Sequence, residues 1–526
     1  MMNNCKFTPK EASYNFTPDV IAAISDVKYG GTISFEYGEY HFYEACACRS
    51  AFAPSNNETG EKIVAFPLID CKNVTIDGNG STFVFHGRLS PFIVKNSSDI
   101  TIKNATLTTH LPSYSLMQIV EKDDEKFVCR FDPTKIPCRA KDGNLVFDTE
   151  TETISTISDK FSFHSLSRVV IRYLFTKDCK ASKEGLAAPY NYCKAIQNGD
   201  CIEFHYLDDE KSEKCVYNVG EYVSINLEEK RFRDVLFLES SKNTLISDIT
   251  VRRGGGMGVI AQLCEDIEIS GFVVHPSDDE KITLTADIIH IVNCSGKLSV
   301  HDCSFMSSLD DACNVHGTYS EVFNVGDGYI DVMYKHEGHS FLDLYKENDV
   351  LRAIDRTSLS ILSEFCVNKA EFIDKSGMKI RIYCETMPEN IQKGCLIESH
   401  KRMPDIHIYR NRSENIPHWR LSGQGDIVVE NNEYIDCNCP VYAYDLAEYW
   451  YESGRINNLV IRNNRFVKAR LTDGFVKTGI SGHEGDKGFV IHKNITVSDN
   501  VFEGLIDKPF DIEGFANVNI KDNIIK

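Results

Sequence analysis

The sequence has no long hydrophobic run and no excess of basic residues. None of its segments approaches the roughly 18 consecutive apolar residues that a membrane-spanning helix needs. Lys and Arg number 57 against 77 Asp and Glu, so the formal net charge is -20. Because phosphate groups are bound by clustered Lys and Arg, this balance argues against nucleic acid as a partner. A transmembrane helix is not expected either, and a neutral substrate fits best.

The chain also lacks recognisable targeting and metal-binding patterns. The N-terminus MMNNCKFTPKEASYNF has neither the basic nor the apolar region of a secretory signal, so we expect a cytoplasmic protein, or a secreted one if a signal has been trimmed. The 19 cysteines include a CAC and a CNC motif but no paired CxxC spacing. They are expected to be reduced and buried, as in cytosolic proteins. No cofactor is expected.

What the chain does have is a short recurring pattern. A polar residue is followed by an apolar alternation, then by Asn, Asp or Gly, then by an aromatic or aliphatic residue, which predicts strand, tight turn, strand. The pattern occurs in KNVTIDGNGSTFVF, SDITIKNATLT, NTLISDITV, EDIEISGFVV, GKLSVHDCSF, GDIVVENNEY, NNLVIRNNRF, KNITVSDNVF and ANVNIKDNII. Several neighbours are separated by roughly 22 to 26 residues, as in a solenoid whose coils must stack to bury their apolar faces. The sequence therefore predicts an all-β protein folded as a right-handed parallel β-helix, with a β-sandwich as the alternative.

Two long segments interrupt this pattern, and both are rich in predicted strands such as SRVVIRYLF and GYIDVMY. We expect them to be inserted β-rich, barrel-like domains carried on coil loops. The stretch TPDVIAAISDV has helical spacing and is expected to cap the first coil. The predicted order is an N-terminal cap with the first strands (1–66), the first coils (67–126), an inserted β domain (127–226), the catalytic coils (227–320), a second β-rich insertion (321–406) and the C-terminal coils (407–526).

The β-helix prediction changes the meaning of an acidic group in LTADIIH and SSLDDACNVHG. Asp287 and Asp310 lie 23 positions apart, about one coil, so their carboxylates should be neighbours about 4.8 Å apart. His290 and His316 follow on the same wall, and Asp311 joins the group if the backbone turns or bulges there. Close carboxylates shift each other's pKa, which is the basis of acid-base chemistry. Structural turn aspartates and a metal site are the alternatives, although no cysteine spacing or i, i+4 histidine pair supports a metal.

Two further stretches attract attention. GGGMG (residues 254–258) matches neither the P-loop nor the dinucleotide-binding pattern, so it predicts a turn or a close backbone approach. AEYWYESGR places Trp450 beside Tyr449, Tyr451 and Glu452, an arrangement that suits stacking on a sugar ring or, equally, an aromatic plug on the flank of the solenoid. Trp419 gives no such cue and is expected to be packing.

The run from GGGMGVIAQ through LTADIIH and SSLDDACNVHGTY, together with WYESGRINNLVIRNNRF, resembles the family 110 glycoside hydrolases. The similarity is close over residues 237–319 and good over 423–466. It implies a right-handed parallel β-helix with barrel insertions, and an exo-acting, inverting α-1,3-galactosidase that needs no metal. It also implies that Asp287, Asp310 and Asp311 line the sugar subsite and that Asp310 or Asp311 activates the water.

Inversion needs an acid and a base about 6.5 to 9.5 Å apart, and neighbouring coils place carboxylates closer than that. We therefore expect the acid to come from elsewhere: Glu337 in KHEGHSF is the first candidate and Glu452 the second, although KHEGHSF matches the family only loosely. Ile288 is bulkier than the residue expected there and is predicted to narrow the site. The expected substrate-binding residues are His290, His316, Asn314, Gln262, Trp450 and Glu452.

The resulting prediction is hydrolysis of terminal α-1,3-linked galactose from oligosaccharides or glycoconjugates, without nucleic acid or membrane partners. A homodimer is compatible with it. One rival is a pectinase-like β-helix hydrolase, which would need Lys and Arg to hold uronates and is a poor match for an acidic protein. The other is a carbohydrate-binding solenoid without catalysis, which would keep the aromatic residues but would not need the aspartates in register.

Overall fold

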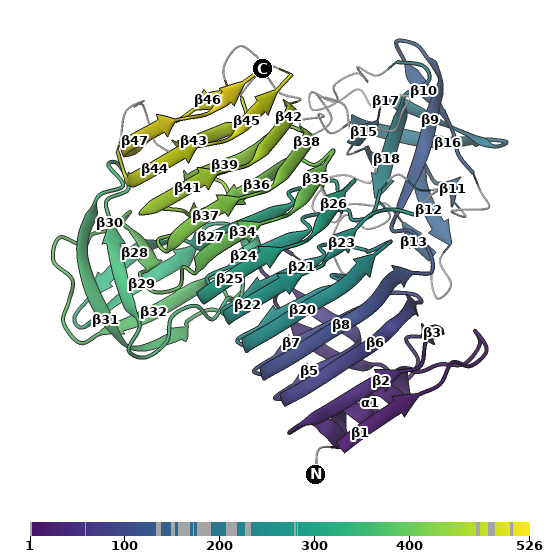
Figure 1. Ribbon diagram of the computed structural model, residues 1–526, viewed down its shortest axis with the longest axis horizontal. Coiled ribbons are helices and arrows are strands. Elements are labelled where there is room, and N and C mark those ends of the chain that lie inside the picture. The colour runs from purple at the N-terminus through teal and green to yellow at the C-terminus, as the bar shows by residue number, and fades with distance from the viewer. Residues whose placement is uncertain are drawn as a thin grey trace.

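The strands of the chain wind into a parallel β-helix with two inserted β structures (Figure 1). The computed structural model describes residues 3–57, 59–132, 138–148, 153–155, 169–171, 173–175, 191–206, 218–226, 233–277, 280, 282–469, 474–481, 490–504 and 509–526. Within them, no helix has the length and apolar character that crossing a membrane requires. The predicted all-β, parallel β-helix class is confirmed.

Each coil contributes strands to two long sheets. The first sheet contains β1 (Asn3–Phe7), β2 (Gly31–Phe35), β3 (Glu39–Phe42), β6 (Lys72–Phe85), β8 (Ser98–Thr109), β20 (Lys242–Val251), β22 (Glu265–Ser270), β23 (Val273–Val274), β25 (Ser295–His301), β26 (Ser304–Met306), β34 (Asp405–Tyr409), β35 (Arg412–Glu414), β37 (Asp426–Glu430), β38 (Glu433–Cys437), β41 (Asn458–Arg462), β42 (Arg465–Ala469), β44 (His492–Ser498), β45 (Val501–Glu503), β47 (Phe515–Lys521) and β48 (Ile524–Ile525). Every repeat segment predicted from the sequence lies in this sheet.

The second sheet carries the candidate site. It contains β4 (Cys48–Phe52), β5 (Gly60–Ile69), β7 (Leu89–Lys95), β19 (Leu236–Glu239), β21 (Val259–Gln262), β24 (Ile289–Val292), β27 (Cys313–Thr318), β36 (His418–Leu421), β39 (Cys439–Leu446), β40 (Glu452–Ser453), β43 (Val476–Ser481) and β46 (Phe510–Asp511). From β5 to β46 the main strands pair in parallel, one coil to the next.

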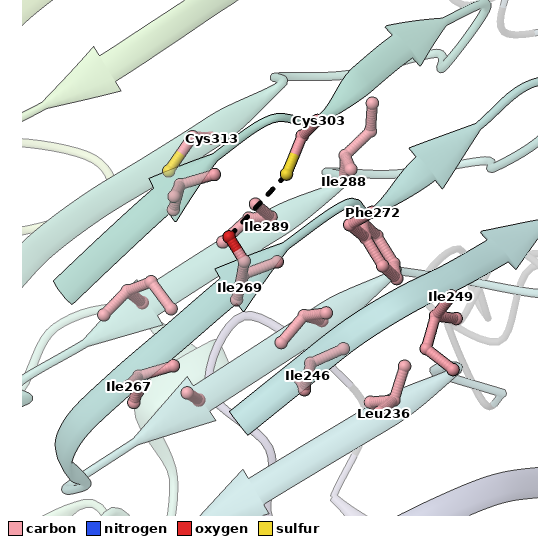
Figure 2. Packing of buried hydrophobic residues seen from close by; sticks show 14 of the residues in the cluster. Leu236, Ile246, Ile249, Ile267, Ile269, Phe272, Ile288, Ile289, Cys303 and Cys313 are labelled. Atoms are coloured by element: carbon pink, nitrogen blue, oxygen red, sulfur yellow. Dashed lines mark hydrogen bonds between the residues drawn. The ribbon is translucent and has the colours of Figure 1, made fainter. Parts of the chain in front are cut away.

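The interior between the sheets is filled by aliphatic side chains in register. Ile246 of β20 is level with Ile269 of β22, and Ile289 of β24 with Cys313 of β27. Figure 2 shows these side chains, and the Cys303 thiol donating a 3.7 Å hydrogen bond to the Ile269 carbonyl. Each fully buried aliphatic side chain stabilises the fold by about 1.5–3 kcal/mol relative to exposure, and the stack repeats this contribution coil after coil.

At the corner of the first sheet, the two turn residues that follow each strand have different roles. In the dipeptides that follow β34, β37, β41, β44 and β47, the first residue has a positive φ, for example 57° at Asn431 and 55° at Asn463. The second residue is an asparagine in each case, buried in the first four and partly exposed in the last. These five form an asparagine ladder: Asn411, Asn432, Asn464, Asn500 and Asn523.

Along this ladder each side-chain oxygen accepts from the previous asparagine's backbone N–H and side-chain amide. The Asn464 Oδ1, for instance, lies 2.9 Å from the Asn432 N and 3.0 Å from its Nδ2. The Asn432 Nδ2 also donates to the Ile408 carbonyl at 3.0 Å. Since buried polar groups are costly when unpaired, this arrangement satisfies the corner of every C-terminal coil with neutral groups.

The predicted helix TPDVIAAISDV is α1 (Thr17–Val27), which buries Val20, Ile24 and Val27 against the first coil. Pro18 lies in its first turn, where its missing N–H would be unpaired in any case. The helix therefore covers the apolar end of the stack, as a cap should.

The second insertion is a closed barrel formed by β28 (Ser320–Gly326), β29 (Tyr329–Tyr334), β30 (Val350–Ile354), β31 (Ile361–Phe372), β32 (Lys379–Cys384) and β33 (Leu396–Ser399), with the short helix η2 (Glu337–His339) between β29 and β30. Figure 1 shows it on one side of the stack. The chain resumes the repeat at DIHIYRNRSE, which forms β34 and β35 and which the sequence pattern had overlooked.

The first insertion forms two separate sheets. One contains β9 (Tyr114–Lys122), β10 (Lys126–Arg130), β14 (Val169–Ile171), β15 (Tyr173–Phe175), β16 (Asn191–Asn198), β17 (Cys201–Tyr206) and β18 (Tyr222–Asn226), and the other contains β11 (Cys138–Lys141), β12 (Asn144–Asp148) and β13 (Thr153–Ser155). β9 pairs with β10 and β18, so the inserted sheet starts at Tyr114 rather than at the predicted residue 127. Parts of SRVVIRYLF and of its surroundings lie outside the described residues.

Candidate active site

Three aspartates meet at the start of two neighbouring strands in the second sheet. Asp287 precedes β24, and Asp310 and Asp311 precede β27. One carboxylate oxygen from each lies within 4.8 Å of the others. Asp287 and Asp311 are buried and Asp310 is partly exposed. The predicted convergence of the three carboxylates is therefore present.

The register within this group differs from the prediction by one residue. β24 and β27 pair Ile289 with Cys313, an offset of 24 positions, and the Ile288 N–H donates to the Asp311 carbonyl at 2.8 Å. Asp287 is thus level with Asp311, and not with Asp310 as the spacing of 23 had suggested. Asp310 joins the group because the backbone turns before β27, with a φ of 59° at Ser307.

Contacts on both sides hold this turn in place. The Ser308 hydroxyl donates to the Ala286 carbonyl at 2.6 Å, which ties the two aspartate segments together. Leu309 packs with Ile282 and Tyr114, and the Tyr114 hydroxyl donates to the Ile282 carbonyl at 2.9 Å. Tyr114 is the first residue of β9, so the start of the first insertion packs against Leu309, the residue before Asp310.

Two buried histidines extend the group along the sheet. The His290 Nδ1 lies 2.6 Å from the Asp287 Oδ2, and its Nε2 lies 3.2 Å from the His316 Nε2. The His316 Nδ1 donates to the Gly317 carbonyl at 2.7 Å. Both nitrogens of each ring therefore have partners inside the protein. The histidines stand beside the aspartates as predicted and orient protein groups there, while their contact with a sugar stays a prediction.

Burial dominates the electrostatics of the group. It raises the pKa of Asp311 well above the ordinary value, and the charges of Asp310 and Asp287 raise it further. Burial also lowers the pKa of His316 to about 4, against the opposing effect of Glu452. His316 is consequently neutral near pH 7, while Asp311 tends to keep a proton.

Glu452 lies at the other end of β27, where its carboxylate faces three protein groups. Its Oε2 is 2.8 Å from Arg420, its Oε1 accepts from the Asn56 side chain at 3.1 Å, and the same oxygen lies 3.5 Å from the His316 Nε2. Burial alone would raise the pKa of Glu452, but Arg420 and the nearby histidines lower it to about 2. A carboxylate that stays ionised at neutral pH is a poor proton donor, which disfavours Glu452 as reserve acid; that role stays a prediction.

Gln262 was predicted to bind substrate, and its contacts show a different role. It is fully buried; its Oε1 accepts from the Ser55 N–H at 2.8 Å, and its Nε2 donates to the Ala53 carbonyl and to Glu239 at 3.0 Å each. Both amide hydrogens are thereby used. Gln262 fixes the loop between β4 and β5, residues 53–57, against the second sheet.

The same loop meets η2 of the barrel insertion. The Asn56 N–H donates to the Gly338 carbonyl at 2.7 Å, and the Ser55 hydroxyl lies 3.0 Å from the His339 Nδ1. The His339 Nε2 lies 2.9 Å from the Trp450 carbonyl. Burial lowers the pKa of His339 to about 3, so this ring is a neutral cross-link between three segments that are distant in sequence.

The first-choice acid and the predicted aromatic contact lie beside this junction. Glu337 is exposed at the first position of η2, and its role as proton donor stays a prediction. The ring of Trp450 is partly buried and lies 4.3 Å, centroid to centroid, from that of His336. Tyr449 is exposed next to it. Trp450 is thus placed at the surface near the site, where a sugar contact remains a prediction.

The positions of the remaining predicted residues in the core or at the surface decide between the alternatives for each of them. Ile288 belongs to the core cluster between the sheets, so it does not narrow the site. Asn314 is buried, level with His290 and Arg420 in the strand register, and its Oδ1 has no hydrogen-bond partner within the described residues. Trp419 is core packing, as expected. A Cβ atom on Gly258 would lie 2.5 Å from the Ile288 carbonyl oxygen, which confirms a close backbone approach at GGGMG.

Arg420 is the main residue that sequence reasoning missed. It lies in PHWRLSG, one coil beyond DDACNVHG, and pairs with Asn314 across β27 and β36. The barrel inserted between these strands hides the coil spacing, so periodicity alone does not connect them. The signal that remains is the pattern of a charged residue on the outward face of a short apolar strand.

The three aspartates also have the spacing of ligands for a cation, the alternative noted from the sequence. Their two histidine neighbours bond to an aspartate and to each other, so neither ring nitrogen of His290 points a lone pair at such an ion. The histidines therefore add no ligand to such a site, and their contacts with Asp287 favour the acid-base alternative.

Comparison with known proteins agrees with the predicted resemblance. The chain is 29% identical to α-1,3-galactosidase A of Shewanella woodyi, covering 90% of this chain and 76% of that protein. It is 26% identical to α-1,3-galactosidase B of Phocaeicola vulgatus (100% and 89%) and 24% identical to α-1,3-galactosidase B of Bacteroides thetaiotaomicron (95% and 81%). No family model matches the sequence.

Solved structures with a similar outline include an exopolygalacturonase from Thermotoga maritima, with a TM-score of 0.41, 10% identity and coverage of 100% of this chain and 93% of that one. The family 28 exopolygalacturonase of Yersinia enterocolitica has a TM-score of 0.39 at 9% identity, with coverage of 99% and 78%. These likenesses bear on neither substrate nor mechanism. The sequence relatives confirm the resemblance of this chain to the α-1,3-galactosidases of glycoside hydrolase family 110.

Proposed function

We propose that the protein is an exo-acting α-1,3-galactosidase that hydrolyses terminal α-1,3-linked galactose from glycans with inversion of configuration. The observation that carries the proposal is the group of three carboxylates on neighbouring coils, within 4.8 Å of one another, in a chain similar to α-1,3-galactosidases over most of its length. Terminal α-galactosyl oligosaccharides or glycoconjugates are the substrates this implies.

Asp310 is the proposed base that activates water. It is the only one of the three aspartates that is partly exposed, so a water molecule can reach it. Its buried neighbour Asp311 has a raised pKa and keeps a proton more readily, which leaves Asp310 as the ionised member of the pair. General base catalysis of this kind typically contributes about 10²- to 10⁴-fold.

Asp287 is the proposed acid, because the histidine contacts place a proton beside it. His316 is neutral and its Nδ1 carries the hydrogen, so its Nε2 accepts from the Nε2 of His290. His290 therefore bears a hydrogen on Nε2. The 2.6 Å contact between its Nδ1 and the Asp287 Oδ2 needs a second hydrogen, because two lone pairs do not approach so closely. The Asp287–His290 pair thus holds a proton that can pass to the leaving oxygen.

The stereochemical outcome is the sharpest test. Inverting enzymes typically separate the two carboxyls by about 6.5–9.5 Å and retaining enzymes by about 5–5.5 Å. The oxygens of Asp287 and Asp310 lie within 4.8 Å of each other, which is closer than the inverting range, so the proposal of inversion rests on the resemblance to family 110 and not on this distance. Incubation of the purified protein with Galα1-3Gal, followed by proton NMR from the first minutes, should show β-galactose as the initial product. Initial α-galactose would contradict inversion, and no release of galactose would contradict the proposed activity.

Variants assayed on α-galactosyl fluoride separate the two roles, because fluoride leaves without protonation. Asp287→Asn should lose far more activity on Galα1-3Gal than on the fluoride, whereas Asp310→Asn should lose both. Glu337→Gln is the matched control. If Glu337→Gln shows the selective loss on Galα1-3Gal and Asp287→Asn does not, the acid is Glu337.

A further inference from the structure

A row of aromatic rings continues from the aspartates along the outer face of the second sheet. The ring of His418, at the start of β36, lies 5.0 Å from that of Tyr442 on β39 at an interplanar angle of 29°. The Tyr442 and Tyr444 rings are 4.3 Å apart and nearly parallel, at 8°. All three side chains are partly exposed. We call these three residues the aromatic row.

Strand register places this row directly beside the proposed base. The Ala312 N–H donates to the His418 carbonyl at 2.7 Å, so His418 is one coil beyond the Asp310–Asp311 turn. β36 then pairs with β39, which brings Tyr442 level with Arg420 one coil further. Tyr444 follows Tyr442 on the same strand, so the row takes one step of about 4.8 Å from His418 to the next coil and then runs along β39. Figure 1 shows β27, β36 and β39 as successive strands of the stack.

The opposite direction along the stack is closed. On the outer face of β19, β21 and the segment before β24, Phe237, Ile260 and Ala286 are buried together with Phe52 of β4 and with Met257. Gln262 then binds the loop of residues 53–57 over the same side. A leaving group that extends along the helix axis from the aspartates is therefore directed over β36 and β39.

The exposed chemistry of the row suits neutral sugars. The His418 Nδ1 donates to the Cys439 carbonyl at 3.0 Å, and burial lowers the pKa of His418, so the neutral ring presents its Nε2 as an acceptor. Burial raises the pKa of Tyr442 and of Tyr444, so both phenols keep their hydrogens. The row thus offers donors, acceptors and apolar ring edges side by side, a combination that binds pyranosides.

The charges at the far end of the row favour a neutral glycan over an acidic one. Tyr442 is level with Lys477 on β43, but the carboxylates of Asp511 and Glu513 lie close enough to Tyr444 to raise its pKa. A uronate or sulfated sugar would meet both of these negative charges as well as the net charge of -20.

We propose that His418, Tyr442 and Tyr444 form the binding site for the neutral sugars on the leaving-group side of the scissile bond. The proposal rests on the galactosidase function proposed above. It adds the residues that bind the sugars next to the terminal galactose.

The test compares two substrates that share galactose and differ in the leaving group. Galα1-3Gal has a sugar on the leaving side and α-galactosyl fluoride has none. In Tyr442→Ala and Tyr444→Ala, the ratio of kcat/KM for Galα1-3Gal to that for the fluoride should fall about tenfold from its wild-type value, the size expected for one lost aromatic contact. Tyr442→Phe and Tyr444→Phe, which keep the rings, should lower the ratio less.

The matched control is Tyr409→Ala. Tyr409 stacks on His301 at 4.6 Å in a similar row, but it lies in the first sheet, away from the aspartates. Its removal should leave the ratio unchanged. An unchanged ratio in all four Tyr442 and Tyr444 variants would overturn the proposed binding site while leaving the galactosidase function intact. A wild-type protein that releases galactose from neither substrate would instead overturn the proposed function itself.

Discussion

Two rows of polar side chains run across the coils at the same spacing. In one row the spacing is favourable, and in the other it is unfavourable. In the asparagine ladder, each amide donates to one neighbour and accepts from the next, as between Asn432 and Asn464. At the aspartate group, Asp287 and Asp311 are level across two coils but carry only acceptors when both are ionised. Stacking therefore satisfies the amides and strains the carboxylates.

The difference shows how one scaffold can be both stable and reactive. A strand spacing of about 4.8 Å is short enough for side-chain hydrogen bonds and also short enough to shift carboxylate pKa values. Where the side chains are neutral, the repeat stabilises the stack. Where they are acidic, the same repeat creates a proton-sharing group, whose unfavourable energy the surrounding coils must offset.

The largest expected effect is on turnover, and it comes from replacing an aspartate of the group by an asparagine like those of the ladder. Asp310→Asn replaces the proposed base by an amide that cannot accept a proton from water. Turnover of Galα1-3Gal should fall by about a thousandfold. Initial-rate measurements of galactose release check this, with circular dichroism to show an intact fold. Wild-type-like turnover in this variant would contradict the proposed site.

The reciprocal change places a carboxylate in the ladder. In Asn432→Asp, an oxygen would face the Ile408 carbonyl and the Asn464 Oδ1, two acceptors that the amide now serves. The free energy of unfolding should fall by about 3 kcal/mol at pH 7. Because burial raises the pKa of such a carboxyl, the loss should grow as pH rises above the unfolded value of about 4 and should shrink below it. Thermal unfolding at pH 4, 5.5 and 7.5 measures the trend, and turnover per folded molecule should stay near wild type.

An intermediate effect is expected from Glu452→Gln, which removes the charge facing Arg420 at 2.8 Å. Because Arg420 is then left buried without its charged partner, the free energy of unfolding should fall by about 2 kcal/mol. Since the pKa of Glu452 is held at about 2, this residue does not titrate between pH 4 and pH 9. The pH values at which activity falls should therefore be the same in wild type and variant. A shift of the alkaline limb would show that Glu452 acts as the acid after all.

The smallest effect concerns Asp311, where removing a carboxyl should stabilise the protein. The raised pKa of Asp311 means that its folded state favours the protonated form, so its contribution is favourable at low pH and is lost as pH rises. Asp311→Asn should raise the free energy of unfolding by about 1–2 kcal/mol at pH 7.5. The difference should vanish near pH 3.5, below the unfolded pKa. A destabilised variant at pH 7.5 would mean that the carboxylate is favourably paired.

Sequence periodicity predicted the stack well because the repeat and its turn residues are local. Asn431 and Asn463 carry the positive φ that the turns require, and the polar alternation marks each strand. It failed where tertiary contacts decide. β9 reads as another strand of the coil but pairs within the insertion, and DIHIYRNRSE follows the barrel without a regular interval.

For the site, residue spacing brought Asp287, Asp310 and Asp311 together but assigned the register one position too short, because the turn at Ser307 adds length that a coil average does not contain. Burial could not be judged from motifs either. Gln262 and Glu452 stand in motifs that suggest sugar contacts, yet both are engaged with protein groups. Arg420 was concealed by the inserted barrel.

That barrel also has a consequence for the order in which the chain is made. Asn314 and Arg420 are strand neighbours, yet roughly a hundred residues separate them in the chain. A ribosome adding about 5–20 residues per second needs roughly 5–20 s to cover that interval. For that time the nascent chain holds its aspartates on an unpaired strand edge with no guanidinium beside them. Because like charges repel, we expect the acidic group to keep other acidic chains away from this edge until synthesis delivers the next coil.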